Sequence, residues 1–138
     1  MKFAHISDTH IKNLKYHYEY RIVFEQLYES LREQEIDYIV HCGDIAHTKT
    51  QISPEFVEMC SDFFRNLAEI APTYIILGNH DGNLKNSSRQ DALTPIVDAL
   101  DLSQLASSGL NQPIQTRSIL HFITAQSATA RLMLAGQW

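Results

Sequence analysis

The chain has 138 residues, of which 44% are hydrophobic and 20% charged, with a formal net charge of −5. These values indicate one globular domain with its own hydrophobic core, and the acidic balance does not suggest nucleic-acid binding by composition alone. No apolar run approaches the roughly 18 residues of a membrane span, and the N-terminus is too short and polar for a signal peptide. We therefore expect a cytoplasmic protein without a membrane contact.

Short apolar segments and amphipathic segments alternate along the chain. Phe24, Leu27 and Leu31 recur at helical spacing, and Ser53-Pro54 is typical of a helix start, with a capping hydroxyl followed by proline. In chain order we expect a strand at 2–7, a helix from about 20 to 35, a strand at 37–42, a helix at 53–70, a strand at 73–77 and a helix at 94–100. The two cysteines, Cys42 and Cys60, are expected as small buried residues rather than as a disulfide.

Strands separated by helices predict a parallel sheet with right-handed crossovers, whose ligands bind beyond the carboxyl ends of the strands. Each of the three predicted strands is followed by ligand-type side chains. The sequences at these strand ends are Asp8-Thr9-His10, Gly43-Asp44 and Gly78-Asn79-His80-Asp81. Three strands therefore deliver polar side chains to one edge of the sheet, which polar turns without function would not require.

These side chains form a plausible ligand set for a metal ion. Asp8 and Asp44 offer carboxylate oxygens, His10 an imidazole nitrogen and Asn79 an amide oxygen, a mixture that suits manganese, iron or zinc better than calcium. Two ions about 3.5–4 Å apart can clamp a phosphate and activate a bridging water. His80, next to Asn79, is placed to protonate a leaving oxygen or to stabilise the phosphate charge.

In this order and spacing, the motifs at Asp8–His10, Gly43-Asp44 and Gly78–Asp81 resemble the first three motifs of the calcineurin-like metallophosphoesterases. Gly43-Asp44-Ile45-Ala46-His47 is most similar to the SbcD-type nuclease subunit of double-strand-break repair complexes. The resemblance implies a layered α/β fold, two Mn²⁺ ions, and 3′-to-5′ exonuclease and single-strand endonuclease activity on DNA. It also implies an SMC-like coiled-coil ATPase partner of the SbcC type, and a His47 close to the substrate phosphate.

The sequence also departs from that family. The family completes its metal site with three later histidines, whereas only His121 follows His80, and we expect it to be a strand residue rather than a ligand. All sixteen acidic residues lie at or before Asp101. We therefore interpret 1–138 as one truncated N-terminal βαβαβα half of the domain. Residues 1–101 carry the resemblance in this interpretation, and 113–138 form an atypical tail.

Further residues carry weaker predictions. Lys12, Lys49 and Arg89 follow the three motifs and are candidate contacts to DNA phosphates, although loop lysines often serve only solubility. Asp81 is expected either to orient His80 or to close its own turn. The apolar residues of the second helix exceed what one sheet face needs, which predicts a homodimer through this helix and the one at 94–100.

Two other functions remain open from the sequence. The same motifs would serve another metallophosphoesterase, such as a cyclic-nucleotide phosphodiesterase or a phosphatase. The missing histidines also permit a degenerate subunit that binds DNA without cutting it.

Overall fold

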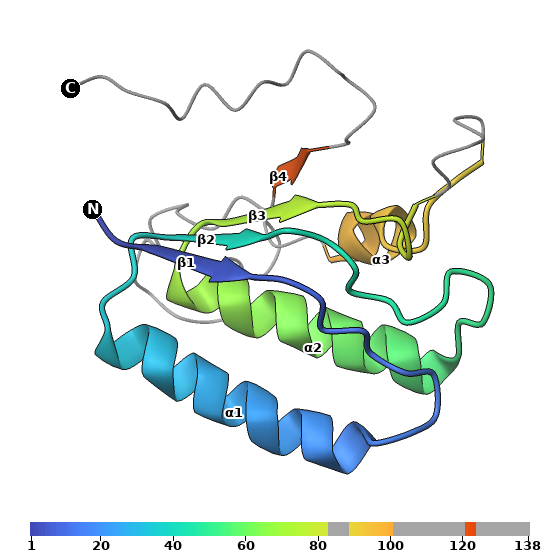
Figure 1. The fold of residues 1–138 in the computed structure, drawn as a ribbon, viewed down its shortest axis with the longest axis horizontal. Helices are drawn as coiled ribbons and strands as arrows, with labels where there is room; N and C mark the ends of the chain where they lie inside the picture. The colour runs from blue at the N-terminus through green and yellow to red at the C-terminus, as the bar shows by residue number, and fades with distance from the viewer. Residues whose placement is uncertain (83–88, 101–120, 124–138) are drawn as a thin grey trace, which may run out of the picture.

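A computed structural model describes residues 1–82, 89–100 and 121–123, the last three by their backbone. Four parallel strands form one sheet in the order β1-β2-β3-β4, with bounds Phe3–Ile6, Tyr38–His41, Thr73–Ile76 and His121–Ile123. The helices α1 and α2 lie side by side beneath one face of this sheet (Figure 1). This is the α/β layered architecture that the alternating pattern predicts, and the strand order advances in one direction across the sheet.

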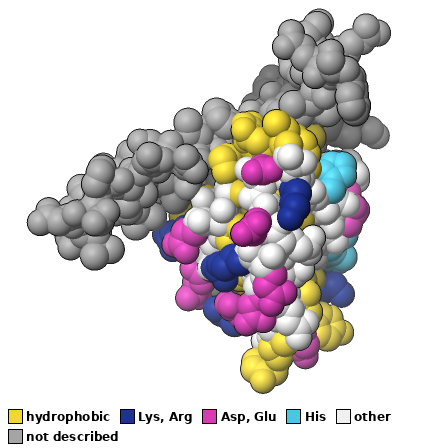
Figure 2. Space-filling model, turned by 90° about the vertical axis from the view of Figure 1, so that its left-hand side faces the viewer, with side chains coloured by type: hydrophobic (Ala, Val, Ile, Leu, Met, Phe, Trp, Pro, Cys, Tyr) yellow, Lys and Arg dark blue, Asp and Glu magenta, His cyan; other side chains and the backbone are white. Residues whose placement is uncertain are grey.

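The side chains of the strands alternate between the two faces of the sheet. Ile39 and Ile75 point to the helices and are fully buried, whereas Tyr38 and Tyr74 point to the opposite face, where they are only half-buried. On that face Phe3, which is 49% exposed, stacks on Tyr38 at a ring-centroid distance of 5.6 Å. Figure 2 shows apolar side chains gathered at the sheet end of the molecule, above a region of mixed charge.

The helices begin and end close to the predicted positions. Helix α1 spans His17–Glu33, α2 spans Pro54–Ile70 and α3 spans Thr94–Ala99. The Ser53 hydroxyl accepts a hydrogen bond from the Phe56 amide, as the Ser-Pro start predicts. Helix α1 starts earlier than predicted, after Tyr16, and the left-handed Glu35 follows its end.

Helix α2 supplies most of the core, and this corrects one expectation. Phe56, Met59, Cys60, Phe63 and Phe64 were expected to leave apolar surface for a partner, but each is 2% exposed or less. The helix packs against both α1 and α3, and Phe63 meets the His41 ring of β2, so much of the surface of α2 is buried. The aromatic rings of Phe24 on α1 and Phe63 on α2, for example, stack at 4.4 Å.

The two cysteines are free, as predicted, but they differ in burial. Cys60 is fully buried, and burial raises the pKa of its thiol. Cys42 is only half-buried, on the face away from the helices, where its Sγ lies 3.1 Å from Nε2 of the exposed His5. His5 is therefore exposed in strand β1, whereas His41 in β2 is fully buried. No helix among the described residues is long and apolar enough to cross a membrane.

His121 begins strand β4, which pairs in parallel with β3, in agreement with its prediction as a strand residue. Most of the expected tail lies outside the described residues. All four strands point the same way, so the loops that follow β1, β2 and β3 meet at one edge, at the right of Figure 1.

Candidate metal centre

The predicted ligands of the first two motifs lie together at this edge. Asp8, His10 and Asp44 each offer one ligand atom, and these atoms all lie within 4.8 Å of one another. Among the described histidines, cysteines and acidic residues, no other group of three is arranged in this way. The structure therefore brings these three predicted site residues together, and their role as metal ligands stays a prediction.

The backbone at these positions adopts an uncommon conformation. Asp8, His10 and Asp44 have φ values of 54°, 44° and 54°, in the left-handed region that side chains other than glycine rarely occupy. Such conformations cost of order 1–3 kcal/mol each and persist only where surrounding contacts enforce them. Their coincidence with the three clustered side chains indicates that the loops are shaped to present these groups.

Hydrogen bonds between the first two loops enforce this arrangement. The amides of Asp8, His10 and Ile11 donate to the carbonyls of Gly43, Asp44 and Ile45 at 3.1, 3.0 and 2.7 Å. The parallel pairing of β1 with β2 therefore continues past both strand ends and through both ligand-bearing loops. The side chains at these loops are consequently held in register with each other.

The donor set fits a divalent metal ion. Nδ1 of His10 is buried without a hydrogen-bond partner among the described residues, an unusual state for a polar atom unless it binds a ligand. Asp8 is exposed at the mouth of the site and Asp44 is half-buried. Two carboxylates and one imidazole suit a transition-metal ion, which these residues would hold.

The loop after β3 approaches Asp44 closely. The His80 amide donates to Oδ1 of Asp44 at 2.9 Å. A Cβ on Gly78 would lie 2.1 Å from the same oxygen, so only glycine fits there. Asn79 stands between these two contacts, with its side chain exposed, beside the carboxylate with which it is predicted to share an ion.

Three histidine rings gather around the site. The His80 ring meets the His10 ring edge-on at 4.8 Å, and the His47 ring lies 5.8 Å from that of His10. Nδ1 of His80 donates to the His47 carbonyl at 2.9 Å, which fixes the proton on Nδ1 and leaves Nε2 for other partners. The structure thus places both predicted catalytic histidines, His80 and His47, against the ligand group.

The three predicted DNA-contact residues have different surroundings. Nζ of Lys49 donates to the carbonyls of Asn79 and Gly82 at 3.1 and 3.0 Å, so it bridges the loops after β2 and β3. Nζ of Lys12 lies 5.0 Å from the centroid of the Tyr16 ring. Arg89 is exposed on the segment that leads to α3.

Asp81 is fully buried, and its carboxylate forms hydrogen bonds with backbone amides rather than with the His80 ring. It accepts hydrogen bonds from backbone amides in its own loop and in the loop after β2. Burial raises the pKa of its carboxyl group, and these amides oppose that shift. Of the two expectations for Asp81, closing the turn is therefore correct. Its hydrogen bonds to the amides of Ile45 and Ala46, in the loop after β2, were not predicted.

Several supporting residues were not predicted from the sequence. The Ser7 hydroxyl donates to Asp8, and the Tyr20 hydroxyl donates to the His10 carbonyl at 2.7 Å. The buried His41 accepts from the Gly43 amide at 3.2 Å, and its other ring nitrogen lies 3.5 Å from the Thr9 hydroxyl. Ser7 and His41 lie next to the motifs in sequence, which is the one signal that they carry, whereas Tyr20 is 10 residues from His10 and carries none.

The sequence of the whole chain agrees with this geometry. The profile of the calcineurin-like phosphoesterases matches residues 1–122. The chain belongs to this family. The match confirms the resemblance inferred from the motifs, and it identifies a phosphoesterase domain whose described ligand group has the chemistry of a divalent-metal site.

Individual relatives of this phosphoesterase are mostly much longer proteins. It is 46% identical over 115 residues to the uncharacterized protein R555 of Acanthamoeba polyphaga mimivirus, which covers 78% of the chain and 8% of R555. It is 32% identical over 84 residues to a protein of Invertebrate iridescent virus 6 that is named a phosphoesterase, which covers 58% of the chain and 28% of that protein. It is 28% identical over 93 residues to the DNA double-strand break repair protein Mre11 of Archaeoglobus fulgidus, which covers 64% of the chain and 21% of Mre11. The chain thus spans between 8% and 28% of the length of these relatives.

Proposed function

We propose that the protein to which this chain belongs hydrolyses phosphodiester bonds of DNA with metal-activated water, as a 3′-to-5′ exonuclease and single-strand endonuclease in repair or recombination. The observation that carries the chemistry is the cluster of Asp8, His10 and Asp44 within 4.8 Å, with the His80 ring against it. DNA as the substrate is supported by the similarity to archaeal proteins named for double-strand break repair.

The residues of the chain divide the work in this proposal. Asp8, His10, Asp44 and Asn79 hold divalent ions, with Mn²⁺ as the proposed metal and two ions in the complete protein. Divalent ions bound there would lower the pKa of a water nucleophile and would neutralise charge on the phosphate. His80, held through Nδ1 by the His47 carbonyl, presents Nε2 to the leaving oxygen and donates a proton when the ring is protonated.

Two of the basic residues support a polyanionic substrate. Arg89 is exposed and Lys12 is half-buried, and both follow loops that carry predicted ligands. Lys49 keeps one N–H beyond its two carbonyl contacts, so it contributes charge near the site while holding the loop of Asn79. A local basic rim of this kind is what an acidic protein needs to bind a phosphate backbone.

The substrate is tested by direct comparison. The metal-loaded complete protein would be assayed on single-stranded DNA, on duplex ends, on a cyclic nucleotide and on a phosphoprotein. The proposal requires EDTA-sensitive cleavage of DNA that exceeds the other activities. Preferential hydrolysis of a cyclic nucleotide or a phosphomonoester would establish the alternative phosphoesterase function instead, and tight DNA binding without any cleavage would establish a degenerate subunit.

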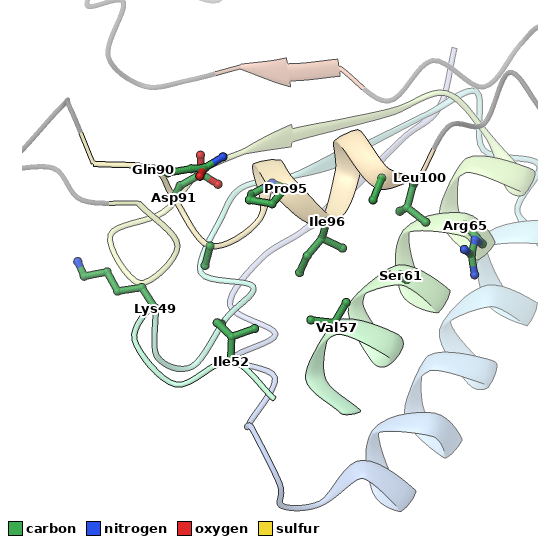
Figure 3. Close-up of a pocket in the computed structure, with 12 residues that line it drawn as sticks. Lys49, Ile52, Val57, Ser61, Arg65, Gln90, Asp91, Pro95, Ile96 and Leu100 are labelled. Atoms are coloured by element: carbon green, nitrogen blue, oxygen red, sulfur yellow. The ribbon is translucent and has the colours of Figure 1, made fainter. Parts of the chain in front are cut away.

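We further propose a homodimer through α2 and α3, together with a coiled-coil ATPase partner. A pocket of about 510 Å³ separates these two helices, and its lining includes Val57, Pro95 and Ile96 (Figure 3). Ile52, 41% exposed at the rim, adds apolar surface. These residues, rather than the buried phenylalanines of α2, now support the dimer.

Sedimentation of the complete protein tests the dimer. Val57→Asp would introduce a charge into the pocket and should shift the protein toward monomer. Ile22→Asp is the matched control, because Ile22 lies on α1 and is already 43% exposed. A wild-type protein that stays monomeric at high concentration would refute the proposal. Co-purification with a coiled-coil ATPase would test the second partner.

A further inference from the structure

Asp81 joins the two loops that carry Asp44 and Asn79. Its Oδ1 accepts from the amides of Ile45 and Ala46 at 2.9 and 2.8 Å, and its Oδ2 accepts from the Gly78 amide at 3.0 Å. The first two donors directly follow Asp44, and they lie 36 and 35 residues from Asp81 in sequence. The third donor directly precedes Asn79. One buried carboxylate therefore holds the backbone on both sides of the predicted shared metal position.

A buried carboxylate is unusual without a cationic partner. None of the basic side chains described by the structure forms an ion pair with Asp81, which is 0% exposed. The Asp81 carboxylate is instead stabilised by the backbone N–H groups that donate to it. Without this carboxylate, the same N–H groups would lack a hydrogen-bond acceptor in the interior. A carboxylate that served only to close the turn 78–82 would need the Gly78 contact alone.

The surrounding contacts show how little freedom the two loops have. A Cβ on Gly43 would lie 2.5 Å from the Gly78 nitrogen, so the two loops touch backbone to backbone beside the Asp81 carboxylate. Lys49 bridges the same two loops from outside, through the carbonyls of Asn79 and Gly82. Asp81 is the buried counterpart of this outer bridge, and its contacts are to the amides of the two residues that follow Asp44.

We infer that Asp81 is a positioning residue of the metal centre, which fixes Asp44 relative to Asn79 through the backbone and so preforms the site before an ion binds. It touches neither ion nor substrate. The inference rests on the metal-binding half of the proposed function and not on DNA as the substrate. It predicts that metal affinity, and not only folding stability, depends on the second oxygen of this side chain.

Asp81→Asn tests this dependence with minimal change in shape. The amide has one acceptor oxygen and one NH₂ group, so a donor must face either the Gly78 amide or the amides of Ile45 and Ala46. One loop is then released. We expect Mn²⁺ affinity to fall roughly 10- to 100-fold, as for other residues that orient metal ligands from behind.

Asp91→Asn is the matched control. Asp91 also accepts backbone amides, those of Leu93 and Thr94 at 2.8 and 2.7 Å, but at the start of α3 and outside the group of Asp8, His10 and Asp44. Its substitution should lower the melting temperature without weakening Mn²⁺ binding. Asp81→Glu restores two carboxylate oxygens and should recover part of the lost affinity.

The measurements use the 138-residue chain. Mn²⁺ affinity is followed by the electron paramagnetic resonance signal of the free ion at a temperature where circular dichroism shows each variant folded. The result expected is weak binding for Asp81→Asn, partial recovery for Asp81→Glu and wild-type binding for Asp91→Asn. Wild-type affinity in folded Asp81→Asn, or equal losses in Asp81→Asn and Asp91→Asn, would overturn the inference.

If Asp81→Asn does not fold, amide hydrogen exchange of the wild-type chain tests whether the two loops are preformed without metal. The amides of Ile45, Ala46 and Gly78 should be protected without metal and should change little when Mg²⁺ is added, because the site is preformed. Rapid exchange that becomes slow only with metal would overturn the inference. The proposed nuclease activity can fail independently of this inference. If the complete protein does not cut DNA but the chain gives the expected metal-binding and exchange results, the role of Asp81 still stands.

Discussion

The backbone amide of His80 donates a hydrogen bond to Oδ1 of Asp44 at 2.9 Å, across 36 residues of sequence. This bond ties the main chain of His80, the proposed leaving-group acid, to the side chain of Asp44, a proposed metal ligand. The two groups therefore keep their relative position whatever the His80 side chain does. Binding of metal by Asp44 and proton donation by His80 should accordingly be separable by mutation.

Gly78→Ala should abolish this arrangement. The added Cβ would lie 2.1 Å from Oδ1 and 2.4 Å from the nitrogen of Asp44, contacts that only a shift of the loop can relieve. We expect a loss of about 1–3 kcal/mol in unfolding free energy, typical of overpacking, together with a loss of Mn²⁺ binding. Gly82→Ala is the control, since its Cβ would meet nothing nearer than 3.7 Å. Equal behaviour of the two variants in calorimetric titration would contradict the assigned contact.

His80→Ala in the complete protein should abolish cleavage and leave metal binding intact. The ring is not part of the described ligand group, and its Nδ1 is occupied by the His47 carbonyl. Loss of a general acid typically costs about 10²- to 10⁴-fold in rate. Calorimetry with Mn²⁺ separates the roles, with Asp44→Ala as the reference for a lost ligand. A loss of binding as large as that of Asp44→Ala would show that His80 is itself a ligand.

His47→Ala should reduce exonuclease activity more than metal affinity. The side chain is exposed at the rim, and its ring lies 6.5 Å from that of His80. The carbonyl that holds His80 belongs to the backbone and remains in the variant, so the effect reports the imidazole alone. Degradation of duplex ends and Mn²⁺ titration would be measured on the same preparation. Unchanged digestion would count against a role at the substrate.

The sequence was sufficient for strands β1, β2 and β3, for the Ser-Pro start of α2 and for the clustering of three predicted site residues, because each depends on local chemistry or on strand topology. Asp8, His10 and Asp44 could be brought together because parallel strands end at one edge. The reach of Asp81 to Ile45 and the bridge made by Lys49 could not be predicted, since both depend on loop conformations that only the packed fold defines. Phe63 and Phe64 were misjudged because helical spacing shows that a face is apolar, but not how many neighbours cover it.

Stability should depend on pH through His41. Burial lowers the pKa of this histidine from its usual value of 6.5 to about 4, so the folded chain binds fewer protons than the unfolded chain between these values. The contribution of neutral His41 to the free energy of unfolding is complete above about pH 6.5. The free energy of unfolding should fall by roughly 3 kcal/mol as the pH drops from 7 to 4. Urea unfolding at several pH values would measure the slope. His41→Asn should be less stable at pH 7, and the difference from wild type should shrink toward pH 4. An unchanged difference would exclude His41 as the titrating group.

The final prediction concerns the 138-residue chain as it stands: it should bind one Mn²⁺ ion weakly and should not be an efficient two-metal nuclease. The family resemblance implies that a two-metal centre of this type also uses three later histidines, because two ions need ligands on both sides. The described residues supply Asp8, His10 and Asp44 as a cluster, with Asn79 beside them.

One ion can be held by the two carboxylates and the imidazole, with water in its open positions. Of the predicted ligands among the described residues, a second ion would have only Asp44 and Asn79, and Oδ1 of Asp44 already accepts the His80 amide. These two ligands are too few to hold a second ion in place or to activate a water molecule between two ions. Manganese stoichiometry and nuclease rate would be measured on the same purified chain, with Asp44→Ala as the control for site-specific binding. Two tightly bound ions together with robust, EDTA-sensitive cleavage would refute the prediction and require ligands beyond these four residues.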